Sequence, residues 1–228
     1  MKGICFIKPL FDATIEGRKT QTRRIANQQP DTCGSCYSYV KSDYKYTGGS
    51  KFCYTESCKT KDSNTACGRY EEYRKPRYKV GETVCLKEPY YVSIKETEKN
   101  PALVYYKYRD KDTEFLKTTG LEKNIPVKWG NKLSMPDKYA RYHIKITAVR
   151  CERLQQISDE DCMKEGIIYD DSSYIACEEY TFLNNIDDWL YDTPREAYAA
   201  LIDKISGKGT WESNPYVWVY DYKLINNK

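Results

Sequence analysis

The chain of 228 residues contains a single histidine and no long apolar run. A membrane-spanning helix needs about 20 consecutive apolar residues, whereas the first apolar run, residues 4–7, ends at Lys8 and Pro9. Hydrolases of the Ser–His–Asp or Cys–His type need a histidine beside the nucleophile, but His143 occupies a polar position in an alternating segment typical of a strand. The phosphate-binding pattern G-x-x-x-x-G-K-S/T is absent, so we expect no ATP- or GTP-driven activity.

Charge is nearly balanced, since 37 basic and 33 acidic residues leave a net charge of +4. This excess is too small to indicate a polyanionic partner by itself. Ten cysteines would suit a disulfide-rich secreted protein, but no leader-like apolar segment accompanies them. We therefore expect a reducing, cytoplasmic location, no membrane partner, and no nucleotide or redox cofactor. The sequence holds no pattern that predicts an oligomeric state.

The hydrophobic patterns predict more strands than helices. Expected strands cover residues 4–7, 20–25, 82–87, 102–108, 141–154 and 216–224. Expected helices start near residues 9, 158 and 194 and stop at Gly17, Gly166 and Gly207. Because these elements do not alternate as regular βαβ units, we expect an α+β fold with a mainly antiparallel, curved or barrel-like sheet. The strand at 216–224 is apolar on both faces, which favours a central position.

Residues 27–78 are rich in Gly, Ser, Asn, Asp, Lys and Tyr and show no apolar period. We interpret them as a surface insertion within a single domain of residues 1–228. Five cysteines lie there as a C-x2-C pair, a C-x4-C pair and one more: Cys33, Cys36, Cys53, Cys58 and Cys67. Four thiolates suit a structural zinc ion, which would order so polar a segment. The first four are the expected ligands, with Cys67 as a substitute; a loop with free thiols is the alternative.

Residues 18–24 read Arg-Lys-Thr-Gln-Thr-Arg-Arg, which places four cations together without an acid. Such a cluster is commonly a solvated face of a protein. Alternatively, cations interleaved with threonine hydroxyls suit contacts with phosphates and bases. The composition of the segment leaves both interpretations open.

In its context this motif resembles the ASCH-domain family, whose members share a PUA-like β-barrel and the pattern G-R-K-T-x-T-x-R. The match lies at residues 17–24, after an apolar strand and a short helix. Further blocks follow in order and resemble the longer, phage-type members: V-G-E-T-V at 80–84 with Glu88, M-P at 135–136 with A-R at 140–141, residues 154–167, G-K-G-T-W at 207–211 and N-P-Y-V-W at 214–218. The resemblance covers most of the chain outside residues 27–78 and 170–190.

The resemblance implies that RNA, a nucleotide or a modified nucleoside binds in a basic cleft between the barrel and the helices. The residues that it assigns to ligand binding are Arg18, Thr20, Arg23, Arg24 and Glu88. A salt bridge from Glu88 to a motif arginine is the alternative role for that carboxylate. Small bacterial members of the family are amidohydrolases that deacylate N4-acetylcytidine. Their catalytic lysine, threonine and glutamate carry over to Lys19, Thr22 and Glu165, the last through C-x-x-E-G at residues 162–166.

The chemistry of this catalytic set sets a geometric condition. A threonine hydroxyl attacks an amide only if a base takes its proton, and lysine, with a reference pKa of about 10.4, must be made neutral by burial or nearby cations. Side chains alternate along a strand, so Lys19 and Thr22 meet only if Lys19 belongs to the turn before the strand. We predict that it does. Binding without turnover would use the same residues.

Overall fold

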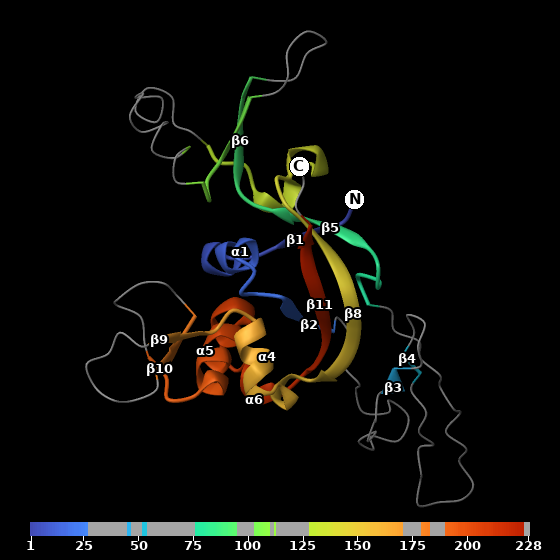
Figure 1. The fold of residues 1–228 in the computed structure, drawn as a ribbon, viewed down its shortest axis with the longest axis vertical. Helices are drawn as coiled ribbons and strands as arrows, with labels where there is room; N and C mark the ends of the chain where they lie inside the picture. Colours follow the sequence, from blue (N-terminus) through green and yellow to red (C-terminus); the bar gives the residue numbers. More distant parts are fainter. Residues whose placement is uncertain are drawn as a thin grey trace, which may run out of the picture. The chain divides into compact units, whose positions relative to one another are not determined.

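The computed structural model describes residues 1–26, 45–46, 52–53, 76–94, 103–109, 112, 128–170, 179–182 and 190–225. The chain divides into two compact units. Unit 1 contains residues 1–19, 83–145 and 223–228, and unit 2 contains residues 20–82 and 146–222. Helices and strands are mixed, and antiparallel strand pairs outnumber parallel ones, so the protein is of the α+β class with mostly antiparallel sheets (Figure 1).

The sheet of unit 1 is built from three strands in the order β1-β5-β8. Strand β1 (Gly3–Cys5) runs parallel to β5 (Thr83–Lys87), which pairs antiparallel with the first residues of β8 (His143–Arg153). Helix α1 (Lys8–Ile15) has a proline in its first turn and ends before Gly17, whose φ of +80° favours glycine. The buried side chains of this unit include Ile4, Phe6, Leu10, Phe11, Val84, Leu86, Met135 and Ile144.

A second small sheet in unit 1 is the hairpin of β6 (Tyr90–Ile94) and β7 (Leu103–Tyr106). Its strands are antiparallel, and the register shifts between Val92 and Ile94. Two 3-10 turns, η1 (Lys132–Ser134) and η2 (Asp137–Tyr139), lie in the segment that leads to β8. A hydrogen bond from the Gly130 amide to the Tyr90 carbonyl (2.7 Å) links that segment to the start of β6.

Unit 2 has the strand order β8-β11-β2. Strand β2 (Gln21–Ile25) pairs antiparallel with β11 (Tyr216–Ile225), so the motif strand lies at an edge and β11 lies between two neighbours. The first residues of β11 are buried on both faces, which confirms the central position that its sequence predicts. Its buried side chains include Val217, Trp218, Val219 and Tyr220.

Two helices of unit 2, α4 (Asp159–Lys164) and α5 (Pro194–Ser206), begin where the sequence predicts. Ser158 accepts a hydrogen bond from the Asp161 amide at the start of α4, and Thr193 accepts one from the Glu196 amide at the start of α5. Shorter elements complete the unit: the turn η3 (Leu154–Gln156), the helix α6 (Thr210–Ser213) and the antiparallel pair β9 (Ile168–Asp170) and β10 (Glu179–Thr181). None of the helices in the described residues is long and apolar enough to cross a membrane.

Most of the predicted insertion at residues 27–78 lies outside the described residues. Within it the structure gives one short antiparallel pair, β3 (Lys45–Tyr46) and β4 (Phe52–Cys53). Cys53 is therefore placed by its backbone only, and the other four predicted zinc residues, Cys33, Cys36, Cys58 and Cys67, fall outside the described ranges. The zinc site stays a prediction.

Candidate functional site

Most of the basic motif is buried rather than solvated. Lys19, Thr22 and Arg23 expose only 1%, 3% and 4% of their surfaces. Arg18 is the exposed member, and its guanidinium forms an ion pair of 2.5 Å with Glu16. Thr20 and Arg24 are half-buried. Burial of a cation is costly unless partners compensate, so the contacts of the buried members decide what the motif can do.

Lys19 lies in the turn between α1 and β2, outside the strand, as the sequence predicts. Its amide donates a hydrogen bond to the Ala13 carbonyl (2.9 Å), which holds the turn against the end of the helix. The Lys19 ammonium is 5.4 Å from the centroid of the Phe6 ring, within range of a cation–π contact. Lys19 belongs to unit 1, whereas Thr22 and Glu165 belong to unit 2; the Lys19–Thr22 pairing stays a prediction.

Within unit 2, the motif strand lies directly beside the end of α4. The Thr20 amide donates a hydrogen bond to the Lys164 carbonyl (2.9 Å), and the next residue, Glu165, follows the helix and is 96% buried. Residues 20 and 165 are thus close in space although they are far apart in the sequence. The structure therefore brings the motif strand of unit 2 and the predicted glutamate together.

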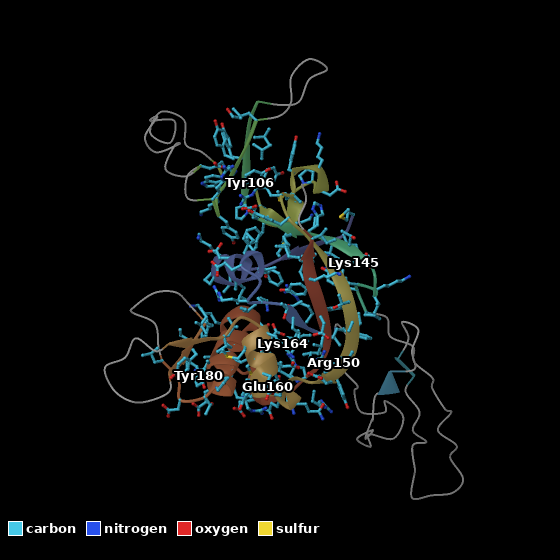
Figure 2. All side chains as sticks on the ribbon, viewed as in Figure 1. Tyr106, Lys145, Arg150, Glu160, Lys164 and Tyr180 are labelled. Atoms are coloured by element: carbon cyan, nitrogen blue, oxygen red, sulfur yellow. The ribbon has the colours of Figure 1, made fainter. Side chains whose placement is uncertain are left out.

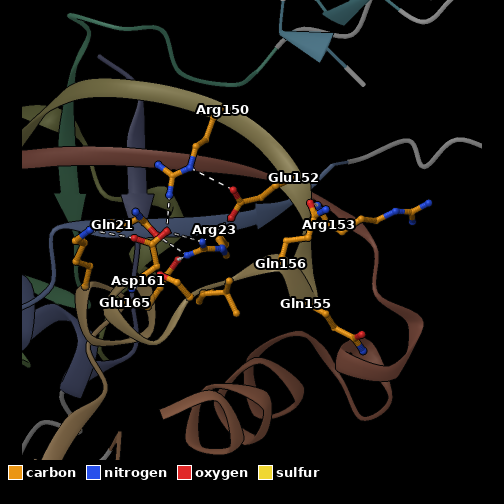
Figure 3. A network of polar contacts seen from close by, with 12 residues as sticks. Gln21, Arg23, Arg150, Glu152, Arg153, Gln155, Gln156, Asp161 and Glu165 are labelled. Atoms are coloured by element: carbon orange, nitrogen blue, oxygen red, sulfur yellow. Dashed lines mark hydrogen bonds and ion pairs between the residues drawn. The ribbon is translucent and has the colours of Figure 1, made fainter. Parts of the chain in front are cut away.

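Arg23 is the centre of a buried ionic cluster (Figure 3). Its Nη2 lies 2.5 Å from Glu152 Oε1 and 3.0 Å from Asp161 Oδ2, and its Nη1 lies 3.3 Å from Glu165 Oε1. The Arg23 side chain is fully shielded from solvent. Burial alone lowers the pKa of Arg23, but the charges of Glu165 and Glu152 raise it by more, so the net shift is upward. Arg23 therefore stays charged and is already neutralised by carboxylates.

A second arginine closes the cluster toward solvent. Arg150 contacts Asp161 (2.6 Å), Asp221 (2.6 Å) and Glu152 (3.3 Å), and 35% of its side chain is exposed. Gln21 donates a hydrogen bond to Asp221 (2.6 Å) and accepts one from Arg23. With the pair Lys164–Asp161, three cations face four carboxylates, which leaves one net negative charge. This side of the motif strand is thus not basic, and a phosphate at Arg23 would have to displace a carboxylate.

Strand alternation divides the motif between two faces. Gln21 and Arg23 share the face of the ionic cluster, so Thr22 and Arg24 point to the other face. The contact between Arg23 and Glu165 uses one carboxylate oxygen, Oε1. It fixes Glu165 beside the strand without showing a contact to Thr22. The Thr22–Glu165 pair, like the full catalytic set, stays a prediction.

The pKa values of neighbouring groups follow from this burial and charge. Burial alone would raise the pKa of Asp161, but hydrogen bonds from Lys164 and Arg23 outweigh it and lower the pKa to about 2. Tyr198 on α5 is buried, and burial together with the charge of Glu165 raises the pKa of its phenol well above 10. Cys162 has a pKa raised to about 12 by burial, so its thiol stays protonated at neutral pH.

Glu88 lies in unit 1 and is paired with Arg141. Two hydrogen bonds, from Arg141 Nε to Glu88 Oε1 (2.8 Å) and from Arg141 Nη2 to Glu88 Oε2 (2.7 Å), join the groups in a fork-like arrangement. The arginine that pairs with Glu88 in the structure is thus Arg141, whereas the sequence suggested a motif arginine as one alternative. Burial raises the pKa of Glu88 and the Arg141 charge opposes that rise. Arg141 also stacks on Tyr106, with Cζ 4.4 Å from the ring centroid.

Sequence reasoning missed two of the three acids that surround Arg23, Glu152 and Asp161. A usable signal was present for Glu152, which follows Arg150 by two residues and so shares its face of β8. No group of three or more metal-ligating side chains occurs in the described ranges. Comparison with protein-family models, with curated proteins and with solved structures finds no match.

Proposed function

We propose that the chain is a PUA-like, ASCH-type protein that binds a nucleotide or a modified nucleoside beside its motif strand in unit 2. The observation that carries the proposal is the position of α4 next to β2: the hydrogen bond from Thr20 to Lys164 places Glu165 beside the motif, and Thr22 and Glu165 are both buried. Buried hydroxyl and carboxylate groups suit the donor and acceptor edges of a base.

The charge of the site favours a nucleoside over a long polyanion as its ligand. Arg23 is neutralised by three carboxylates, so Arg24, which is half-buried, is the cation of β2 that suits a phosphate. An RNA chain bound along the motif would need several unneutralised cations. Recognition of one base, with at most one phosphate, agrees better with this arrangement.

Calorimetric titration with cytidine, N4-acetylcytidine and cytidine monophosphate tests this proposal. We expect saturable one-to-one binding that is weakened at least tenfold by Glu165→Gln and by Thr22→Val, because each removes a buried polar contact. Glu212→Gln, an exposed glutamate of α6, is the matched control and should bind like the unchanged protein. No heat of binding with any of these nucleosides would refute the proposal.

Amide hydrolysis is the second candidate, and the position of Lys19 favours it. Lys19 lies in the turn before β2, outside the strand, and is 99% buried. In the reaction that the ASCH resemblance implies, Lys19 takes the Thr22 proton while the hydroxyl oxygen adds to the acyl carbonyl. The amine leaves with a proton relayed through Glu165, and water then hydrolyses the acyl ester to a carboxylate and a free hydroxyl.

Incubation with N4-acetylcytidine, followed by chromatography, separates turnover from binding. Release of cytidine and acetate in equal amounts, lost in Lys19→Ala and in Thr22→Val, would support hydrolysis. Lys204→Ala on α5 is the control for removing a lysine elsewhere. Binding of the nucleoside without release of cytidine over many hours would leave the binding proposal standing and reject the enzymatic one.

A further inference from the structure

The β6–β7 hairpin in unit 1 carries a set of tyrosines that the nucleoside site of unit 2 does not use. Four of them form two cross-strand pairs, Tyr90 with Tyr106 and Tyr91 with Tyr105. All four are partly exposed, and none of the hairpin side chains that the structure describes is buried. An isolated two-stranded hairpin is only marginally stable in water, so contacts with the rest of unit 1 are needed to hold it in place.

One face of the hairpin packs on its own unit. Tyr106, labelled in Figure 2, donates a hydrogen bond from its hydroxyl to the Tyr139 carbonyl (2.9 Å) and lies under the Arg141 guanidinium. Its partner Tyr90 lies 6.0 Å from the Tyr139 ring, measured between centroids. These contacts hold the hairpin in place, and they account for Tyr90 and Tyr106.

The opposite face presents Tyr91 and Tyr105. Adjacent pairs along an antiparallel ladder alternate between faces, so these two rings point away from Tyr90 and Tyr106. The rings stack on each other with centroids 6.3 Å apart and an interplanar angle of 28°. Cross-strand aromatic pairs stabilise a hairpin, but that role alone does not account for the charges around them.

Cations predominate in the sequence of the hairpin and of the segments next to it. Residues 87–94, 103–109, 112 and 128–142 contain seven lysines and arginines and three acids, a net charge of +4 (7 − 3). Each of the three carboxylates already pairs with a cation: Glu88 with Arg141, Asp112 with Arg109, and Asp137 with the chain's terminal ammonium. Lys107, two residues after Tyr105, is exposed. The net charge is complementary to an anionic ligand.

We propose that the outer face of this hairpin binds single-stranded nucleic acid, with bases stacking on Tyr91 and Tyr105 and a phosphate contacting the exposed Lys107. Partly exposed aromatic rings next to cations are the combination that single strands require, because every base has a face available for stacking and every nucleotide a phosphate. In a duplex the base edges are paired and the base faces are stacked on one another, so no base face is available to stack on the tyrosine rings. The inference goes beyond the nucleoside site and does not depend on it.

Fluorescence anisotropy of labelled 12-mers tests the proposal: oligo-U RNA, oligo-dT DNA and a duplex of mixed sequence, each at 50 and 200 mM salt. We expect both single strands to bind and to weaken at the higher salt, and the duplex to bind at least tenfold more weakly. The double variant Tyr91→Ala/Tyr105→Ala should lose at least tenfold in affinity, whereas Tyr91→Phe/Tyr105→Phe, which keeps both rings, should stay within about threefold. Lys107→Gln should reduce the salt dependence.

Tyr169→Ala is the matched control, because Tyr169 is an exposed tyrosine of β9 in unit 2. Thermal unfolding of each variant, followed by circular dichroism, verifies that the hairpin changes leave the fold intact. No binding of the unchanged protein to either single strand would overturn the proposal. It would also be overturned by a folded Tyr91→Ala/Tyr105→Ala protein with unchanged affinity, whatever the outcome of the nucleoside titrations with Glu165→Gln.

Discussion

Replacing Arg23 by methionine tests whether the buried ionic cluster is what holds β2 against α4. Methionine has a similar length but no charge, so the carboxylates of Glu152, Asp161 and Glu165 lose a shared partner. Removing one member of a buried ion pair costs about 3–5 kcal/mol, mostly because the remaining charge stays buried without compensation. Arg150 still neutralises Glu152 and Asp161, so the cost falls mainly on Glu165, which is 4% exposed.

The matched variant is Arg150→Met, in which a partly exposed arginine of the same cluster is removed. Pairs at the surface contribute about 0.2–1 kcal/mol each, so we expect a loss of about 1–2 kcal/mol there, well below that of Arg23→Met. Urea unfolding at pH 7.5, followed by tryptophan fluorescence, measures both losses.

Equal losses for the two variants would refute this reasoning, since burial would then make no difference to the value of the contacts. Arg23→Lys separates charge from geometry: it keeps the charge and loses the fork, and we expect an intermediate loss.

Three further predictions concern other parts of the molecule. The pKa of Asp161 is lowered from 3.8 to about 2 in the folded protein, so its contribution of about 2 kcal/mol is complete above about pH 5 and is lost as the pH falls through about 4 toward 2; acid unfolding of Asp161→Asn should be correspondingly less steep in that range. Thr193→Ala removes the cap of α5 and should cost about 1 kcal/mol in urea unfolding, with Thr193→Ser as the neutral comparison. Protein purified without chelator should contain about one equivalent of zinc by elemental analysis, and Cys33→Ser should reduce it; less than about a tenth of an equivalent would contradict the zinc site.

The elements that the sequence predicted are those with strong local signals. The caps at Ser158 and Thr193, the proline in the first turn of α1 and the glycine after it fixed three helices to within a few residues. Apolar residues on both faces of the segment predicted that β11 is a central strand, and its burial agrees. In contrast, β6 was not predicted. Its residues, Tyr-Tyr-Val-Ser-Ile, are strand formers, but they follow β5 so closely that the sequence does not mark them as a separate strand.

The ionic cluster was beyond prediction for a different reason. The partners of Arg23 lie 129, 138 and 142 residues further along the chain, and nothing local in the motif identifies them. A basic run therefore looked like a charged surface or a phosphate site. Pairing with distant carboxylates depends on which strand lies beside which helix, and composition does not encode that arrangement.

The pairing of β2 with β11 has a consequence for how the protein is made. Residues 21–25 leave the ribosome early, yet their partners are residues 217–221. During translation the edge of the motif strand that pairs with β11 stays unpaired until residues 217–221 have emerged. Contacts of such long sequence separation also slow folding. A nascent chain stalled before residue 216 should therefore expose the motif strand. We expect chaperones to bind this segment during synthesis.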